Sequence, residues 1–415
     1  MGGRAMKLAS LSAFPTDVDR ARRGGAFGAA ERDAAAEIVR AVRRGGDAAV
    51  VRTVRRFDNP RARSEALIVD AAALRRAARA CPPQICRALD LAYARIRAFH
   101  ERQRPRTATR RDSTGEFQLA PTPLERVGAL VPRGKCSYPS TVLMTGVPAQ
   151  VAGVRALAVA SPMPTDASID AALAYALELV GATVLYRAGG AAAVAALAYG
   201  TRSLPRVDKI VGPGNAYTAA AKWLVSADVG IDALQGPSEL VAVASGDTDV
   251  RSLALDLLAQ AEHGGGAFAA LISDDTAWLR AVADVVRGAH GARVRGYSAR
   301  DLGAAVRAAN EAAPEHVLLA GHRAAAHAAA VDRAGAVFVG TRSAVAFGDY
   351  VAGTNHALPT GGTARWSSAL RVDDFVRWTS RVSLRGDLRQ LARAGAAIAD
   401  HEAMHYHRAS IEARA

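Results

Sequence analysis

The chain has 415 residues, half of them hydrophobic and 22% charged, with three cysteines and a formal net charge of +14. This length favours two or more domains, and so few cysteines exclude a disulfide framework and a cysteine metal site, which fits a cytoplasmic protein. The positive charge is scattered arginine without interleaved aromatics, and no apolar run reaches roughly 18 residues, so we expect neither nucleic acid nor a membrane as a partner.

The N-terminal part of the chain predicts helices more clearly than strands. Residues 1–25 read as a loosely structured arm that lacks the apolar centre of a secretory signal. Apolar residues at three- and four-residue spacings predict helices within 29–55 and from 71 to about 103, with an interruption at Pro82. Residues 67–69 are a short strand candidate between these helical zones.

Strands and helices alternate from residue 127 onward. Alternation over 127–239 predicts parallel βαβ units in a doubly wound sheet, and its return over 240–372 predicts a second α/β module. We assign 26–126 to the module of 240–372, because these helices have no sheet of their own to cover. Residues 373–415 lack a strand pattern and read as a helical tail. The predicted fold class is α/β, with two doubly wound Rossmann-like parallel-sheet domains, a small N-terminal arm and a helical C-terminal tail.

The stretch 256–264 predicts the last turns of an amphipathic helix that closes at a run of glycines. Gln260 and His263 are three residues apart and would share one face of this helix. An amide oxygen and an imidazole nitrogen at this spacing are either half of a metal site or part of a solvated helix end.

Three further stretches place polar residues in turns. Gly212–Asn215 follows a strand and opens a helix, so it is either a phosphate-binding turn or an ordinary βα turn. Gly236–Glu239 precedes a strand, where Ser238 matters only if a ligand lies close by. Glu315 and His316 at a strand start are either a surface pair or an acid–base pair. The second reading requires the turn to bring both side chains to one site.

The C-terminal region carries carboxylates and imidazoles in two places. The loop 348–362 is rich in Gly, Thr, Asn and Pro, and loops of this length are uncommon unless functional. Within it, Asp349 could supply an oxygen ligand, and His356 follows seven residues later. The tail carries a cluster of such side chains, namely His401, Glu402, His405 and His407. Clustered histidines indicate either metal binding or a solvated helix end.

Taken together, these stretches resemble the histidinol dehydrogenase family over nearly the whole chain. The resemblance is carried by Gly212–Tyr217 with Ala221-Lys222, Gly236–Glu239, Gln260–Gly264, Pro314–His316 and Gly348–Gly362. It implies an enzyme of histidine biosynthesis that depends on Zn2+, one ion per subunit, and on NAD. Such an enzyme oxidises L-histidinol through the aldehyde to L-histidine in two NAD-linked steps.

The resemblance also implies roles for individual residues. Glu315 and His316 are the implied acid–base pair, and Asn215 is an implied cofactor contact. The implied zinc ligands are Gln260, His263, Asp349 and a tail histidine from the partner in a homodimer. Glu402 and His407 fit the family's Glu-x-x-x-x-His pattern, which favours His407 over His405 as that histidine. The implied substrate contacts are Ser238, Gln260, His263, His316, Asp349, His356, Glu402 and His407. The module of 26–126 and 240–372 would thus carry the metal and catalytic residues, and 127–239 the cofactor.

Positions on the cofactor side depart from the family pattern. The family reads Gly-Leu-Tyr-Val-Pro-Gly-Gly where this chain has 128–134, so that Leu130 replaces the tyrosine and Arg133 a glycine. The family also reads Gly-Gly-Ala-Gln-Ala where Ala192 replaces the glutamine. Leu130 and Ala192 therefore occupy positions of family cofactor contacts, and each change could weaken cofactor binding by about 1–2 kcal/mol. Arg133 offers a phosphate contact instead.

These departures leave two alternatives open. One is a paralogue that oxidises another small polar alcohol to an acid. The other is a zinc-binding homologue with weak or lost dehydrogenase activity.

Overall fold

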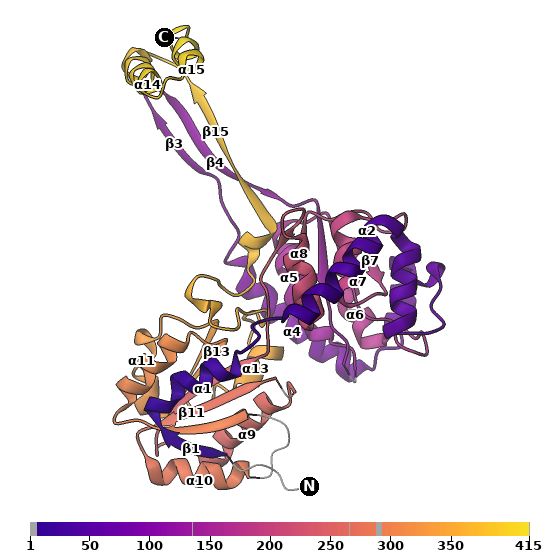
Figure 1. The fold of residues 1–415 in the computed structure, drawn as a ribbon, viewed down its shortest axis with the longest axis vertical. Helices are drawn as coiled ribbons and strands as arrows, with labels where there is room; N and C mark the ends of the chain where they lie inside the picture. The colour runs from indigo at the N-terminus through magenta and orange to yellow at the C-terminus, as the bar shows by residue number, and fades with distance from the viewer. Residues whose placement is uncertain (1–5, 135, 265, 288–292, 415) are drawn as a thin grey trace.

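The computed structural model describes residues 6–134, 136–264, 266–287 and 293–414 (Figure 1). They form two six-stranded sheets flanked by helices and a third sheet of three strands that projects from the rest. The predicted fold class, α/β with two parallel-sheet domains and a helical end, is confirmed. Within the described part of the chain, every helix is too short or too polar to cross a membrane.

Domain A is built on the sheet with strand order β1-β12-β11-β10-β13-β14, in which neighbouring strands pair in parallel. Its strands are β1 (Lys7–Ser10), β10 (Glu239–Ala244), β11 (Phe268–Ser273), β12 (Arg293–Ser298), β13 (His316–Ala320) and β14 (Ala336–Val339). Its helices are α1 (Phe14–Ala21), α9 (Val250–Ala261), α10 (Thr276–Val286), α11 (Leu302–Ala312), α12 (Gly321–Ala325) and α13 (Val345–Tyr350). Alternate residues of β10 pack on opposite faces: Leu240 lies against α9 and α10, and Val241 against α1 and α11. Because both faces are covered, the strand reads as a continuous apolar run.

Domain B is built on the sheet with strand order β2-β7-β6-β5-β8-β9. Its strands are β2 (Ile68–Asp70), β5 (Arg126–Leu130), β6 (Ala156–Ala160), β7 (Val184–Tyr186), β8 (Lys209–Val211) and β9 (Gly230–Ile231). Its helices are α2 (Ala29–Phe57), α3 (Ala71–Ala78), α4 (Pro83–Glu101), α5 (Pro139–Ala152), α6 (Ala171–Leu179), α7 (Gly190–Tyr199) and α8 (Ala216–Val225). In domain B the chain adds β6 and then β7 on one side of the central strand β5, and then adds β8 and β9 on its other side. Domain A repeats this order around β10, with β11 and β12 on one side and β13 and β14 on the other. This crossover is the doubly wound topology.

The assignment of the first helices to the module of 240–372 is wrong. Helix α2 packs against α7 and α8, α3 against α6, and α4 against α5, so these three helices cover domain B. Strand β2, between α2 and α3, joins the same domain by pairing with β7. Apolar spacing shows which face of a helix is buried but not which sheet that face covers. Residues 26–101 therefore belong with 127–231.

The prediction of a loose N-terminal arm over 1–25 is wrong for residues 7–21. Strand β1 extends the sheet of domain A beside β12, and α1 packs its apolar face against α11. Asp17 in α1 is buried and accepts hydrogen bonds from Arg295 Nη1 at 2.9 Å and Tyr297 Oη at 3.0 Å. Apolar packing and this buried carboxylate together fix the segment to domain A.

The third sheet has the order β15-β4-β3 and carries the C-terminal helices at its far end (Figure 1). Its elements are β3 (Ala108–Asp112), β4 (Gly115–Pro123), β15 (Val376–Leu384), α14 (Arg389–His401) and α15 (His405–Glu412). Helices α14 and α15 confirm the predicted helical tail, but the expectation that 373–415 hold no strand is wrong at β15. Most side chains of β15 are exposed, so the strand lacks the apolar alternation that marks a strand packed on a core.

Candidate active site

The candidate active site lies at the amino ends of β10 and β13 in domain A. These neighbouring strands pair in parallel with Leu240 opposite His316, so the residues that precede them lie side by side. Glu315 is 8% exposed and His316 is 4% exposed. Ligands of open α/β sheets usually bind at the carboxyl ends of strands. The candidate site lies at the opposite edge of the sheet, where the turns before β10 and β13 position its polar residues.

Glu315 and His316 share one site, as the acid–base interpretation requires. Ser238 Oγ donates to Glu315 Oε2 at 2.6 Å, and the backbone N–H of Glu239 donates to the same oxygen at 2.9 Å. His316 Nδ1 lies 3.4 Å from that oxygen. Strand β13 begins at His316, so Glu315 lies just outside the strand and is free of the alternation that would separate the two side chains.

The hydrogen bonds of His316 define which nitrogen can accept a proton. Its Nδ1 lies 3.0 Å from the backbone oxygen of Glu239. A carbonyl oxygen only accepts, so the proton of the neutral ring resides on Nδ1. This arrangement leaves Nε2 of His316 as the basic atom.

Opposite charges shift the pKa values of the pair. Burial alone would raise the pKa of Glu315, but the charge of His316 and the hydrogen bonds from Ser238 and Glu239 outweigh it and lower this pKa. Burial alone would lower the pKa of His316, but the carboxylates of Glu315 and Asp349 outweigh it and raise this pKa. The two residues therefore favour an ion pair in the structure.

Three candidate metal ligands lie on or directly after the neighbouring helices α9 and α13 of domain A. Gln260 is buried in the last turn of α9, and its Nε2 donates to Ser238 Oγ at 3.0 Å, which leaves the carbonyl oxygen as the donor atom for a metal. His263 is exposed just beyond the end of α9, and Gly264 after it has a φ of +106°. The predicted glycine closure of this helix is thus observed.

Asp349 is half-buried in α13, which packs against α9. Its charge acts on the imidazoles of both His316 and His356 and tends to raise the pKa of each. Burial nevertheless lowers the pKa of His356, whose Nδ1 lies 3.0 Å from the backbone oxygen of Asp349. An amide oxygen, an imidazole and a carboxylate in this region fit a zinc-type ion chemically.

One chain does not supply the whole expected ligand set. No group of three or more His, Cys, Asp and Glu side chains within the described ranges is placed to hold a metal. Glu402, His405 and His407 are exposed. Figure 1 places α15 at the tip of the projecting sheet, away from α9 and α13. The structure therefore does not bring the tail residues to Gln260 within the same chain.

On the cofactor side, the turn after β8 is held by a buried ion pair. Asn215 caps α8 by accepting from the backbone N–H of Thr218 at 3.0 Å. Lys222 pairs with Asp232 and donates from Nζ to the Gly212 oxygen at 3.1 Å, while Asp232 Oδ2 accepts from the Gly212 N–H at 2.7 Å. Sequence reasoning included Lys222 in a motif without a role, because only the fold shows that it meets Asp232.

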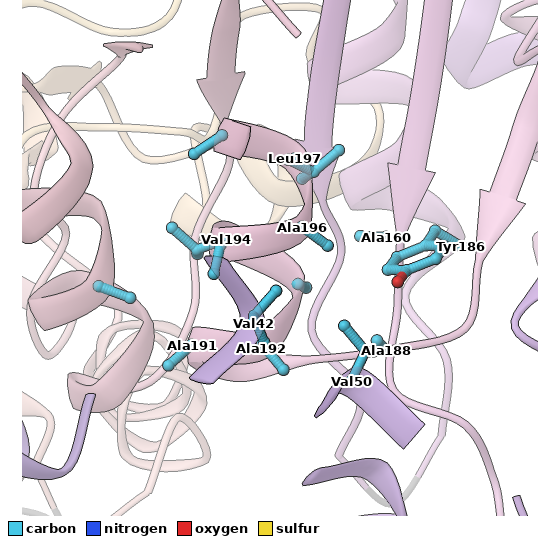
Figure 2. Close-up of a cluster of buried hydrophobic side chains, with 14 of the residues drawn as sticks. Val42, Val50, Ala160, Tyr186, Ala188, Ala191, Ala192, Val194, Ala196 and Leu197 are labelled. Atoms are coloured by element: carbon cyan, nitrogen blue, oxygen red, sulfur yellow. The ribbon is translucent and has the colours of Figure 1, made fainter. Parts of the chain in front are cut away.

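The two altered family positions are buried rather than exposed to a ligand. Leu130 is 4% exposed and Ala192 is 1% exposed, and both belong to the hydrophobic cluster between α2, α7 and the sheet of domain B. Figure 2 shows Ala192 among Val42, Val50 and Ala188 of this cluster. Both apolar side chains thus pack into the core of domain B.

A polar cavity of about 320 Å³ lies beside the carboxyl ends of β5 and β6. Arg133 lines it together with Asp58 and Asp166. Burial raises the pKa of Asp58 to about 6, against a hydrogen bond from the backbone of Gly189. Arg133 therefore lies at the carboxyl edge of the domain B sheet, and no sequence motif pointed to its neighbour Asp58.

Comparisons with known proteins agree with the sequence resemblance. A sequence model of the family described as histidinol dehydrogenase matches residues 22–415. The chain is 42% identical over 394 residues to histidinol dehydrogenase of Ruegeria pomeroyi, covering 91% of both chains. It is 43% identical over 393 residues to histidinol dehydrogenase of Mesorhizobium japonicum, again covering 91% of both. The crystal structure of histidinol dehydrogenase from Elizabethkingia anophelis is similar with a TM-score of 0.90 and 26% identity, over 99% of this chain and 98% of that chain.

Proposed function

Because this chain belongs to the histidinol dehydrogenase family of oxidoreductases that act on a CH–OH group, we propose that it oxidises L-histidinol to L-histidine in two NAD-linked steps. One Zn2+ per subunit and a role in histidine biosynthesis are part of this proposal. A cytoplasmic location is also proposed, since Cys81, Cys86 and Cys136 are free thiols, as a reducing compartment would keep them.

The observation that carries the proposal is the position of Ser238 between two functional groups. Its hydroxyl donates to Glu315 and accepts from the amide of Gln260. One side chain thus connects the acid–base pair to a candidate zinc ligand. An alcohol held at that ligand would lie next to the acid and the base.

Bound NAD supplies the hydride acceptor, and bound zinc supplies a Lewis acid that orients the alcohol. In the first oxidation the neutral ring of His316 takes the hydroxyl proton at Nε2, since its Nδ1 proton is engaged by the backbone oxygen of Glu239, and the Glu315 carboxylate then pairs with the imidazolium that forms. In the second, Glu315 takes a proton from the water that adds to the aldehyde. The hydrogen bonds of Ser238 and Glu239 fix its Oε2, so Oε1 is the oxygen proposed to receive that proton.

The proposed zinc ligands are Gln260, His263 and Asp349, with His407 from the second subunit of a homodimer. The distance of α15 from α9 in one chain supports a ligand supplied in trans (Figure 1). His405 is the alternative tail ligand. Proposed contacts of the substrate are Ser238, His356 and Glu402 in addition to the zinc ligands and His316, and Asn215 is the proposed contact of the cofactor.

The test is turnover of the zinc-loaded protein with L-histidinol and excess NAD, followed by absorbance of the reduced nicotinamide. We expect two reduced cofactors for each histidine formed. Turnover of other small alcohols without turnover of histidinol would contradict the substrate assignment. Failure of NAD to bind at millimolar concentration would contradict the NAD-linked reaction and favour a zinc-binding homologue.

A further inference from the structure

The backbone of Glu239 holds both members of the acid–base pair. Its N–H donates to Glu315 Oε2 at 2.9 Å, and its carbonyl oxygen lies 3.0 Å from His316 Nδ1. The carboxylate of the same residue is buried, with Glu239 only 5% exposed. Burying a carboxylate is costly unless it is paired and hydrogen-bonded, so the partner of this side chain helps to fix the position of the Glu239 backbone.

That partner is Arg22, which lies 217 residues earlier in the chain. Arg22 Nε donates to Glu239 Oε1 at 2.6 Å, and Nη2 donates to Oε2 at 2.7 Å. The planar guanidinium thus makes two parallel hydrogen bonds to the carboxylate. This geometry fixes orientation as well as charge, which a lysine cannot do.

The third nitrogen of Arg22 reaches the turn that delivers Glu315. Its Nη1 donates to the backbone oxygen of Ala312, the last residue of α11, at 2.8 Å. Ala313 follows with a φ of +46°, a left-handed conformation that is unfavourable for alanine. The N–H of Ala313 donates to the Ala309 oxygen at 2.9 Å within the turn, and Arg22 adds a contact from outside it. Arg22 thus connects the end of α11 to the start of β10, next to Ser238 and Glu239.

We propose that Arg22 is a positioning residue for the reaction, which holds Glu315 and His316 in register through Glu239 and Ala312. The proposal rests on the acid–base roles given to that pair above. Arg22 is not needed to anchor α1, because Asp17 of that helix is bound separately by Arg295 and Tyr297. The two functions of the N-terminal segment can thus be separated by mutation.

The test compares Arg22→Lys with Arg295→Lys as the matched control. Both changes keep the charge and weaken one ion pair of the N-terminal segment, but only the first reaches the active site. A displacement of catalytic groups by about 1 Å costs about 100-fold in rate. We expect Arg22→Lys to lower kcat by about tenfold or more, with KM and bound zinc within about twofold of the wild type. Arg295→Lys should lower the melting temperature and leave kcat nearly unchanged.

Two further measurements keep the outcome decisive. Added guanidinium should restore kcat to Arg22→Ala, whereas Arg295→Ala should keep a kcat near that of the wild type with and without guanidinium. In 15N-histidine NMR spectra, the Nδ1 signal of His316, assigned by its loss in His316→Gln, should shift in Arg22→Lys and stay in place in Arg295→Lys.

Equal losses of kcat in the two lysine variants would overturn the proposal, since they would show that only docking of α1 matters. An unchanged kcat and an unchanged His316 signal in Arg22→Lys would overturn it as well. The NMR comparison needs no turnover, so it tests Arg22 even if L-histidinol proves not to be the substrate.

Discussion

Replacing Ser238 by alanine tests the link between the acid–base pair and the metal ligand. The change removes the donor to Glu315 Oε2 at 2.6 Å and the acceptor of Gln260 Nε2 at 3.0 Å. A hydrogen bond to a charged group contributes about 1.5–3 kcal/mol, and the buried amide left without a partner costs about 1–3 kcal/mol. If the first interaction is fully expressed in the transition state, kcat falls by about 10- to 150-fold.

The second loss acts on the metal. Without Ser238, the amide of Gln260 is no longer held with its oxygen toward the proposed zinc position, so zinc should bind more weakly. The assay measures kcat for L-histidinol and zinc per chain after dialysis against a weak chelator. The matched control is Ser252→Ala in α9, the helix that carries Gln260. This change removes an exposed hydroxyl that donates to Asp249 at 2.7 Å. Wild-type kcat and zinc content in Ser238→Ala would refute the linkage.

Three further predictions concern the proposed metal site, the core of domain B and the acid–base pair. His263→Ala should lose zinc and activity together, because one proposed ligand is gone; full zinc occupancy by metal analysis would contradict this. Ala192→Gln should destabilise the protein by about 1–3 kcal/mol in denaturant unfolding, because the longer side chain enters a filled cluster, and an unchanged midpoint would show that the site has room. The acid limb of kcat should lie above about pH 6.5, because His316 acts when neutral and, against burial, the Glu315 carboxylate is the main cause that raises its pKa. A limb below that value in the pH profile would exclude this base.

The alternation of strands and helices could be predicted because buried parallel strands are continuous apolar runs in the sequence. Strands β10 and β11 are buried at every position, and each is followed by a helix with one apolar face. Strand β15 has no such apolar run, since it lies in a projecting sheet and its side chains are mostly exposed. The domain to which α2–α4 belong depends on packing between distant segments, which periodicity within one segment does not contain.

Only part of the candidate site could be predicted from the sequence. The resemblance pointed to Glu315, His316 and Gln260. In the structure Ser238 is hydrogen-bonded to Glu315 and Gln260, and His316 Nδ1 lies 3.4 Å from the same Glu315 oxygen. Arg22 had no sequence signal, because a single arginine among many gives no sign of the carboxylate it binds across 217 positions. The family pattern shows that the side chain at Ala192 differs, but only the fold shows that this alanine packs into the core of domain B.

The position of α15 at the tip of the projecting sheet has a consequence for dimers that combine two different mutant chains. Under the proposed function, each active site combines the body of one chain with the tail of another, so two different defects can complement each other. A chain carrying His263→Ala still has an intact tail, and a chain carrying His407→Ala still has an intact body. In a mixed dimer of these two inactive chains, one site collects both defects and the other contains neither. Activity that returns on mixing would therefore identify the tail as a part exchanged between subunits.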